Sequence, residues 1–102
     1  MKSWGENMLK YIVLGKWTDE GRRTLDDIKT RIETARKLIE GLNGNLSLCF
    51  TMGEYDFVGI IDVPDEETMV KIVLKLNKMQ NFVTTTLRAW TDTEFIKLVS
   101  EL

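Results

Sequence analysis

Histidine is absent from the 102-residue chain, which also has only one cysteine and one proline. The absence of histidine removes the commonest general base, the usual transition-metal ligand and any serine–histidine or cysteine–histidine nucleophile. The single cysteine, Cys49, excludes an intramolecular disulfide and leaves no ligand set for zinc. We therefore expect no metal and no cofactor. We expect Cys49 to be a small buried apolar side chain, because nothing near it in the sequence would stabilise a thiolate.

A strong net charge and long apolar runs are also missing. The 14 basic and 16 acidic residues are interspersed and give a net charge of −2. This charge provides no positive electrostatic potential that would bind the phosphate backbone of a nucleic acid. The apolar runs are far shorter than the roughly 20 residues of a membrane helix, and the N-terminus lacks the pattern of a signal peptide. We expect a cytoplasmic protein that binds neither nucleic acid nor membrane. Residues 1–7 are expected to form a flexible arm and residues 8–102 a single domain.

The apolar pattern along the chain predicts an α+β fold. Alternating or mainly apolar stretches predict strands at 8–17, 45–52, 57–63 and 82–90. Apolar residues at spacings of three and four predict a helix over 25–42, a second helix after its cap Asp65, and a short third helix after the capping box Thr91–Glu94. The order β-α-β-β-α-β with a C-terminal helix predicts a ferredoxin-like sandwich. In that fold a four-stranded antiparallel sheet carries two helices on one face.

The sheet face that the two helices leave bare, which we call the open face, is predicted to be too apolar for contact with water. Strand 8–17 carries apolar residues on both sides: Leu9, Tyr11, Val13 and Trp17 on one, Met8, Ile12 and Leu14 on the other. In strand 82–90 we expect Val83, Thr85, Leu87 and Ala89 to face the helices, and Phe82, Thr84, Thr86, Arg88 and Trp90 to face the open side. The last helix is expected to turn Phe95, Leu98, Val99 and Leu102 inward.

A large exposed apolar patch is unusual on a monomer. We therefore expect a homo-oligomer, at least a dimer formed through the open face, as the simplest cover for it. A partner of another kind or a large ligand is the alternative.

Three short stretches occur in order: Lys16–Gly21 (KWTDEG), Thr51–Asp56 (TMGEYD) and Thr86–Thr91 (TLRAWT). Together they resemble the GYD domain family of small prokaryotic proteins, named for a Gly-x-Tyr-Asp-type turn, and the resemblance runs from about Tyr11 to Val99. It implies a fold of the dimeric α/β-barrel group, whose members include small monooxygenases, isomerases, haem proteins and amino-acid-sensing domains. The fold alone does not choose among these activities. The missing histidine disfavours the haem-binding branch.

The turn 53–56 offers the candidate catalytic residues. Tyr55 could donate a hydroxyl proton, and Asp56 could act as a carboxylate base. A structural interpretation competes with this one, because glycine supplies a positive φ in a turn and aspartate accepts backbone N–H groups there.

The candidate ligand-binding residues are Tyr11, Trp17, Tyr55 and Arg88, which would line a space between two facing sheets. On that apolar surface the Arg88 guanidinium needs an anion, such as Asp56, Asp62, a partner's carboxylate or a ligand. Three hypotheses remain open at this point. The first is a dimeric barrel that binds a small organic molecule, the second is a cofactor-free enzyme of the monooxygenase or isomerase type, and the third is an assembly module.

Overall fold

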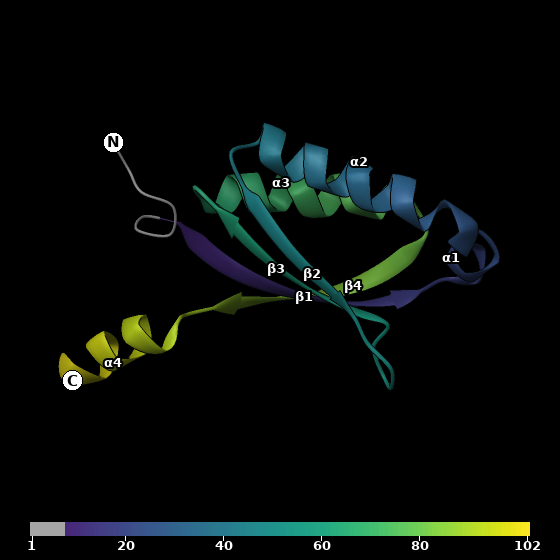
Figure 1. Cartoon of the computed structure of the whole chain (residues 1–102). Helices are drawn as coiled ribbons and strands as arrows, with labels where there is room; N and C mark the ends of the chain where they lie inside the picture. The colour runs from purple at the N-terminus through teal and green to yellow at the C-terminus, as the bar shows by residue number, and fades with distance from the viewer. Residues whose placement is uncertain (1–7) are drawn as a thin grey trace.

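The computed structural model describes residues 8–102, so the predicted N-terminal arm 1–7 lies outside the described residues. Four strands and four α-helices follow one another along the chain, with one short 3-10 helix (Figure 1). The strands are β1 (Leu9–Trp17), β2 (Asn45–Phe50), β3 (Phe57–Val63) and β4 (Phe82–Ala89). The helices are α1 (Asp19–Arg23), η1 (Leu25–Asp27), α2 (Ile28–Gly41), α3 (Glu66–Asn77) and α4 (Asp92–Ser100).

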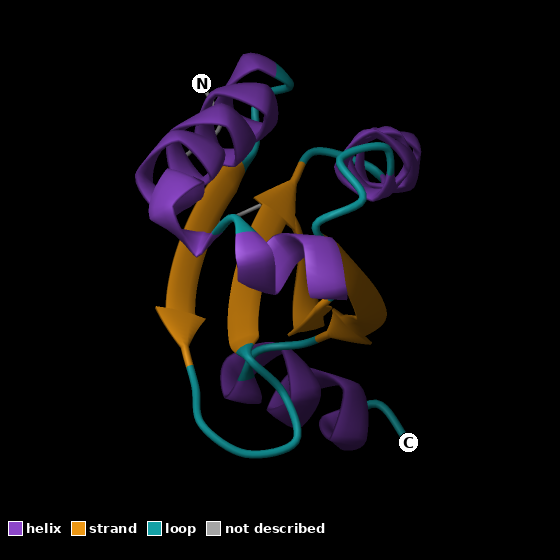
Figure 2. Cartoon of the chain, turned by 90° about the vertical axis from the view of Figure 1, so that its right-hand side faces the viewer, coloured by secondary structure: helices purple, strands orange, loops and turns teal. Residues whose placement is uncertain are grey.

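The strands form one antiparallel sheet in the order β2-β3-β1-β4. Helices α2 and α3 lie together on one face of this sheet (Figures 1 and 2). The predicted ferredoxin-like α+β fold is therefore confirmed. The core sits between that helix pair and the sheet, and its most deeply buried side chains are Val63, Ile39, Ile61 and Ile72.

The register of β4 contradicts the predicted faces of that strand. Directly opposed residues of antiparallel strands share a face, and Arg88 lies opposite the buried Tyr11, while Phe82 lies opposite Trp17. The even-numbered residues of β4 thus lie on the helix side, and Val83, Thr85, Leu87 and Ala89 lie on the open face. A shift of one residue exchanges every side chain between the faces. The prediction failed because β4 is an edge strand that the helices cover incompletely, so Thr86 stays exposed on the helix side.

The prediction that α4 turns its apolar residues inward is also wrong. Helix α4 lies on the opposite side of the sheet from α2 and α3, at the end where β4 leaves it (Figures 1 and 2). Its apolar side chains are exposed: Phe95, Ile96, Leu98, Val99 and, beyond the helix end, Leu102. The capping box predicted its start correctly, since the hydroxyl of Thr91 accepts from the Glu94 N–H and the Glu94 carboxylate accepts from the Thr91 N–H. Local capping forms this helix without the support of a core.

Helix α3 starts at the predicted cap. The Asp65 carboxylate accepts hydrogen bonds from the backbone N–H of Thr68 at 2.8 Å and from its hydroxyl at 2.7 Å. The backbone bond, followed by the hydroxyl bond, holds the pKa of Asp65 below its ordinary value. A depressed carboxyl pKa stabilises the fold fully above the pKa of the unfolded state, and this contribution disappears as the pH falls through the folded-state pKa.

We expect Asp65→Ala to lower the thermal unfolding midpoint at neutral pH, because the first turn of α3 loses its acceptor. The difference from the parent protein should shrink once the pH falls below roughly 3.9, the ordinary pKa of aspartate. Circular dichroism melts of both proteins across this range test the prediction. Asp65→Asn is the control, because it keeps the acceptor but cannot titrate. A stability difference that stays constant into acid would contradict this role.

Candidate functional site

The carboxylate of Asp56 holds two distant segments of the sheet together. Its Oδ2 accepts a hydrogen bond from the backbone N–H of Trp17 at 2.8 Å, and its own N–H donates to the carbonyl of Gly15 at 2.8 Å. The turn before β3 is thereby fastened to the end of β1. Asp56 does accept a backbone N–H, as the structural interpretation predicted, but the donor lies on another strand and not within the turn.

The rest of the turn closes on itself. The Thr51 N–H donates to the Asp56 carbonyl at 2.9 Å, and the Thr51 hydroxyl donates to the Tyr55 carbonyl at 2.7 Å. Gly53 has a φ of +123°, the positive value expected of the turn glycine. The Lys16 ammonium lies 5.2 Å from the centre of the Tyr55 ring. Tyr55 and Asp56 line neither of the two pockets described below.

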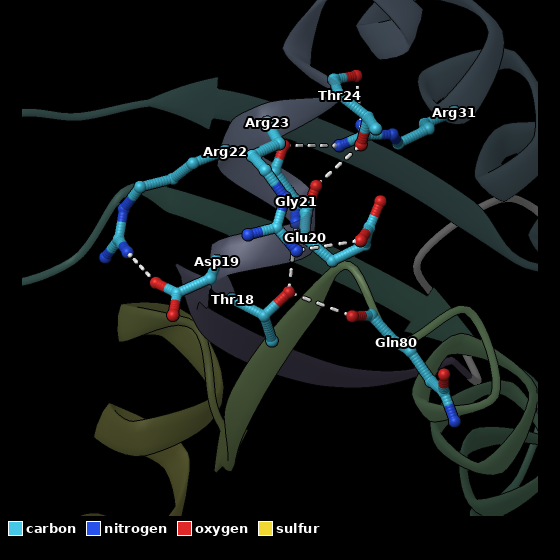
Figure 3. A network of polar contacts seen from close by, with 9 residues as sticks. All are labelled: Thr18, Asp19, Glu20, Gly21, Arg22, Arg23, Thr24, Arg31 and Gln80. Carbon is cyan, nitrogen blue, oxygen red and sulfur yellow. Dashed lines mark hydrogen bonds and ion pairs between the residues drawn. The ribbon is translucent and has the colours of Figure 1, made fainter.

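A second polar network joins α1 to the turn before β4 (Figure 3). The hydroxyl of Thr18 accepts from the Gly21 N–H at 3.0 Å and donates to the Gln80 carbonyl at 2.9 Å. The backbone of Gly21 is packed so closely that a Cβ there would lie 1.9 Å from the carbonyl oxygen of Asn81. Position 21 therefore requires glycine for space, and Thr18 caps the start of α1.

Arg88 has a different environment from the one predicted. Its guanidinium donates to the backbone carbonyls of Lys10, at 3.1 Å, and of Ala89. It also lies over two aromatic rings, 4.6 Å from the centre of Trp90 and 5.6 Å from that of Tyr11. The predicted carboxylate Asp62 instead binds Lys10 at 2.9 Å on the open face, and Asp56 binds Trp17. Carbonyl dipoles and aromatic faces compensate this charge where an anion was expected.

Glu94 is an acidic residue whose pKa is lowered by the backbone of Thr91 and, in part, by the charge of Arg88. The hydrogen bond from the Thr91 backbone is the main cause that lowers the pKa of Glu94, and the charge of Arg88 contributes less. The capping bond from Thr91, more than the charge of Arg88, therefore sets the environment of this carboxylate.

The four predicted ligand-binding residues do not meet at one place. Tyr11 and Arg88 are paired at one end of the β1–β4 ladder, and Trp17 lies six residues further along β1, roughly 20 Å away at 3.3 Å per residue. All three face the helix side, so they would not face a space between two open faces. Tyr55 lies in the turn. Tyr11 and Trp17 do line pockets, but two different ones.

Trp17 lines a cavity of about 60 Å³ between α2 and the sheet. Arg31 and Thr84 are its only polar side chains; the other lining residues are Val13, Trp17, Ile28, Ile32, Ala35, Ile39, Leu46, Leu48, Phe50, Phe57, Gly59, Ile61, Leu76 and Phe82. The void exists because Ala35 and Gly59 contribute almost no side-chain volume.

Four aromatic residues gather at this cavity. The rings of Trp17 and Phe50 are stacked with centres 6.0 Å apart, Phe57 lies 5.4 Å from Trp17, and Phe82 meets Phe57 edge-on at 5.3 Å. This aromatic cluster was not among the sites predicted from the sequence. A signal was present, because all four residues stand at strand ends that the antiparallel order brings together, with Phe50 opposite Phe57 and Trp17 opposite Phe82.

Tyr11 belongs to the second pocket, an open groove of about 750 Å³ between α3 and β4. Its other lining residues are Glu66, Glu67, Met69, Val70, Lys71, Val73, Leu74 and Thr86. Within residues 8–102 there is no cluster of side chains that could hold a metal ion. No helix in this part of the chain combines the length and the apolar character needed to cross a membrane.

A family model of the GYD domain matches residues 11–99. The chain is a member of the GYD domain family. Neither the curated proteins nor the solved structures give a match. Membership therefore rests on the family model, and it agrees with the three stretches that suggested it.

The structure shows which contacts are made by residues of the three stretches that suggested the GYD domain. Asp56 binds the Trp17 amide and so connects the first two stretches, while Gly21 fits against Asn81. Arg88 and Trp90 in the third stretch stack at the point where the chain leaves β4. Each of these contacts stabilises the fold, and none of them lies at a shared cavity.

We expect Asp56→Ala to reduce the free energy of unfolding by about 1–3 kcal/mol, because it removes a charged acceptor and leaves the Trp17 amide without a partner. Urea unfolding measures this loss. Asp56→Asn keeps an acceptor oxygen in place and should lose less. Equal stability of the alanine variant and the parent protein would show that the bond to Trp17 contributes nothing.

Proposed function

We propose that this GYD domain acts as a homodimeric assembly module, in which two open faces pack together and close an α/β barrel. One observation carries the proposal, namely the apolar centre of the open face. In one row across the sheet Ile12 lies between Ile60 and Leu87, and in the next Leu14 lies between Val58 and Thr85. Helices α2 and α3 lie on the other face of the sheet and do not cover these rows (Figures 1 and 2).

The register of β4 places Val83, Thr85, Leu87 and Ala89 on this face, where Phe82, Thr84, Thr86, Arg88 and Trp90 were expected. Val83 and Leu87 are 58% and 45% exposed there. Polar side chains lie at the margin, where Lys10 pairs with Asp62. An apolar centre with a polar rim is the usual composition of a protein interface.

The overall shape of the chain also supports the packing of a second copy against the open face. Helix α4 and the loop between β2 and β3 both project on the open side, at opposite ends of the sheet (Figure 1). The radius of gyration is 14.8 Å, whereas a compact domain of this length has roughly 13 Å. A partner seated between the two projections would cover α4 as well as the sheet.

The apolar area available is sufficient for a stable interface. The exposed apolar side chains on this side come from the sheet and from α4: Ile60, Val83, Leu87, Phe95, Ile96, Leu98, Val99 and Leu102. Together with the half-buried Ile12, Leu14 and Val58, they offer an area on the order of the 800 Å² that each partner of a standard interface buries. An isologous pair is the simplest arrangement, because a two-fold axis places the same patch on both sides.

Assembly is favoured over the other two hypotheses by the position of the polar groups. In the two central rows of the open face the hydroxyl-bearing side chains are Ser47 and Thr85, and there is no Asp, Glu, Lys or Arg that would hold an ionic ligand between the sheets. The candidate base Asp56 is engaged by the Trp17 amide and adjoins neither pocket. A dimer interior filled by side chains agrees with both facts.

We expect the purified chain to have twice its 11.8 kDa mass in light scattering coupled to gel filtration. Leu87→Lys should convert the dimer to a monomer, because two lysines would be buried in the apolar centre. Leu74→Lys is the matched control, since Leu74 is also an exposed leucine but lies on α3, across the sheet. A parent protein with the mass of one chain would rule out the proposal.

Cys49 provides an independent measure of the same interface. The prediction that it is buried is wrong, because it is exposed on the open face opposite Val58. In the dimer we expect its thiol to react slowly with a thiol-specific reagent, and in Leu87→Lys we expect the reaction to be at least about tenfold faster as the face becomes accessible. Equal rates in the two proteins would place Cys49 outside the interface.

A further inference from the structure

The two edges of the sheet differ in how well they are protected against pairing with another strand. Strands β2 and β4 form these edges. Natural proteins protect an edge with proline, lysine, a bulge or a covering element, because its unpaired N–H and C=O groups can bind a further strand. On β2, the guanidinium of Arg36 donates to the carbonyl of Leu46 at 2.8 Å. One acceptor of that edge is thus already occupied by a side chain of α2.

Strand β4 has none of these protecting features over most of its length. It pairs with β1 in one continuous register without a bulge. From Phe82 to Leu87 it contains no charged residue and no proline. Within residues 8–102, no backbone group from outside the β1 ladder bonds to this strand. The groove of about 750 Å³ between α3 and β4 also leaves space beside Thr86. The edge of β4 is therefore accessible to another strand.

The contacts of β1 show which backbone groups of β4 are free. In antiparallel strands the N–H and C=O of one residue point to the same neighbouring strand, and successive residues alternate between the two neighbours. The Gly15 carbonyl accepts from Asp56, so the odd-numbered residues of β1 point toward β3. The even-numbered residues of β1 therefore bond to β4, where they lie opposite odd-numbered residues. The free groups of β4 belong to its even-numbered residues, Phe82, Thr84, Thr86 and Arg88.

We propose that the edge of β4 pairs with the same edge of a second copy, antiparallel and about a two-fold axis at Thr85. In this register Phe82 bonds to the partner's Arg88, and Thr84 bonds to the partner's Thr86. All four residues with free backbone groups then have a partner within the strand. An axis at Thr84 or at Thr86 would instead place Arg88 or Phe82, respectively, opposite a residue outside β4.

The side chains that this register opposes are compatible with a second copy as the occupant. Directly opposed residues share a face. On the helix side Thr84 would lie against the partner's Thr86, and on the open face Val83 would lie against the partner's Leu87. Threonine pairs and apolar pairs stabilise neighbouring strands, whereas opposed like charges destabilise them. The one charged residue of β4, Arg88, lies opposite a phenylalanine, so the strand complements its own copy without a like-charge contact.

This edge contact is separate from the dimer proposed above and does not depend on it. A two-fold axis perpendicular to the sheet keeps both open faces on the same side, so the edge contact leaves them free to pack on another pair. Each chain has one β4 edge, and an isologous contact uses it completely. Assembly therefore stops and does not continue into a fibre. The two interfaces together would give a tetramer.

Sedimentation velocity over about a hundredfold range of protein concentration tests the edge contact. We expect the mass to double from its value at the lowest concentration, whether that value is the mass of the open-face dimer or of a single chain. Thr86→Pro should abolish this increase, because proline removes an N–H that points to the free edge and takes no part in the β1 ladder. Thr86→Val is the matched control, since it keeps the N–H, and it should associate as the parent protein does.

Amide hydrogen exchange in the parent protein gives a second measurement that needs no substitution. With rising concentration we expect exchange at the Thr84 and Thr86 amides to slow at least about fivefold, because the partner strand shields them from water. The amides of Leu48 and Phe50 are the internal control. By the same alternation they point to the free edge of β2, and their exchange should not change.

The proposal is overturned if the mass stays constant over the whole range, or if Thr86→Pro associates as strongly as the parent protein. Slower exchange at Leu48 and Phe50 in place of Thr84 and Thr86 would assign the contact to β2 and overturn it as well. Because Thr86 does not lie on the open face, Thr86→Pro leaves the proposed dimer intact. Failure of the edge contact and failure of the dimer are therefore separately visible.

Discussion

The central strand β1 is apolar on both faces, and two helices can cover only one of them. Tyr11 and Val13 are buried beneath the helices, while Ile12 and Leu14 point to the open face. Most of the organisation of the molecule follows from this constraint. The helices form a core on one side, and the apolar side chains of the other side are left without a helix pair over them. Helix α4 and the β2–β3 loop extend away from the core on that other side (Figure 1).

Elements with strong local signals could be predicted from the sequence. Strand β3 has the predicted bounds 57–63, and Asp65 and the Thr91 capping box start their helices as expected. The faces of β4 could not be predicted, because its pattern is weak and its register depends on pairing with β1. The position of α4 could not be predicted from the sequence either, because its apolar stripe does not reveal whether the helix packs on its own chain or on another.

In the candidate site, too, some features could be predicted from the sequence and others could not. The sequence singled out Trp17, Asp56 and Arg88 as candidate site residues, but it could not identify their contacts. Asp56 binds an amide 39 residues away, and Arg88 contacts a carbonyl 78 residues away. The cavity under α2 was missed because it arises from what Ala35 and Gly59 lack, and missing volume has no signature in a single sequence. The contacts of Asp56, Gly21 and Arg88, which lie in the three stretches that suggested the GYD family, maintain the architecture, and membership of the family leaves the chemistry open.

The contact between Arg88 and Trp90 means that the two sides of the sheet are not mechanically independent. Arg88 belongs to the helix side, whereas the helix that begins two residues after Trp90 lies on the other side. The Arg88 guanidinium is itself anchored to the Lys10 carbonyl, so the last turn of chain before α4 is tied to the central strand β1. A side chain of the helix side thereby borders the point from which the chain passes to the opposite side of the sheet.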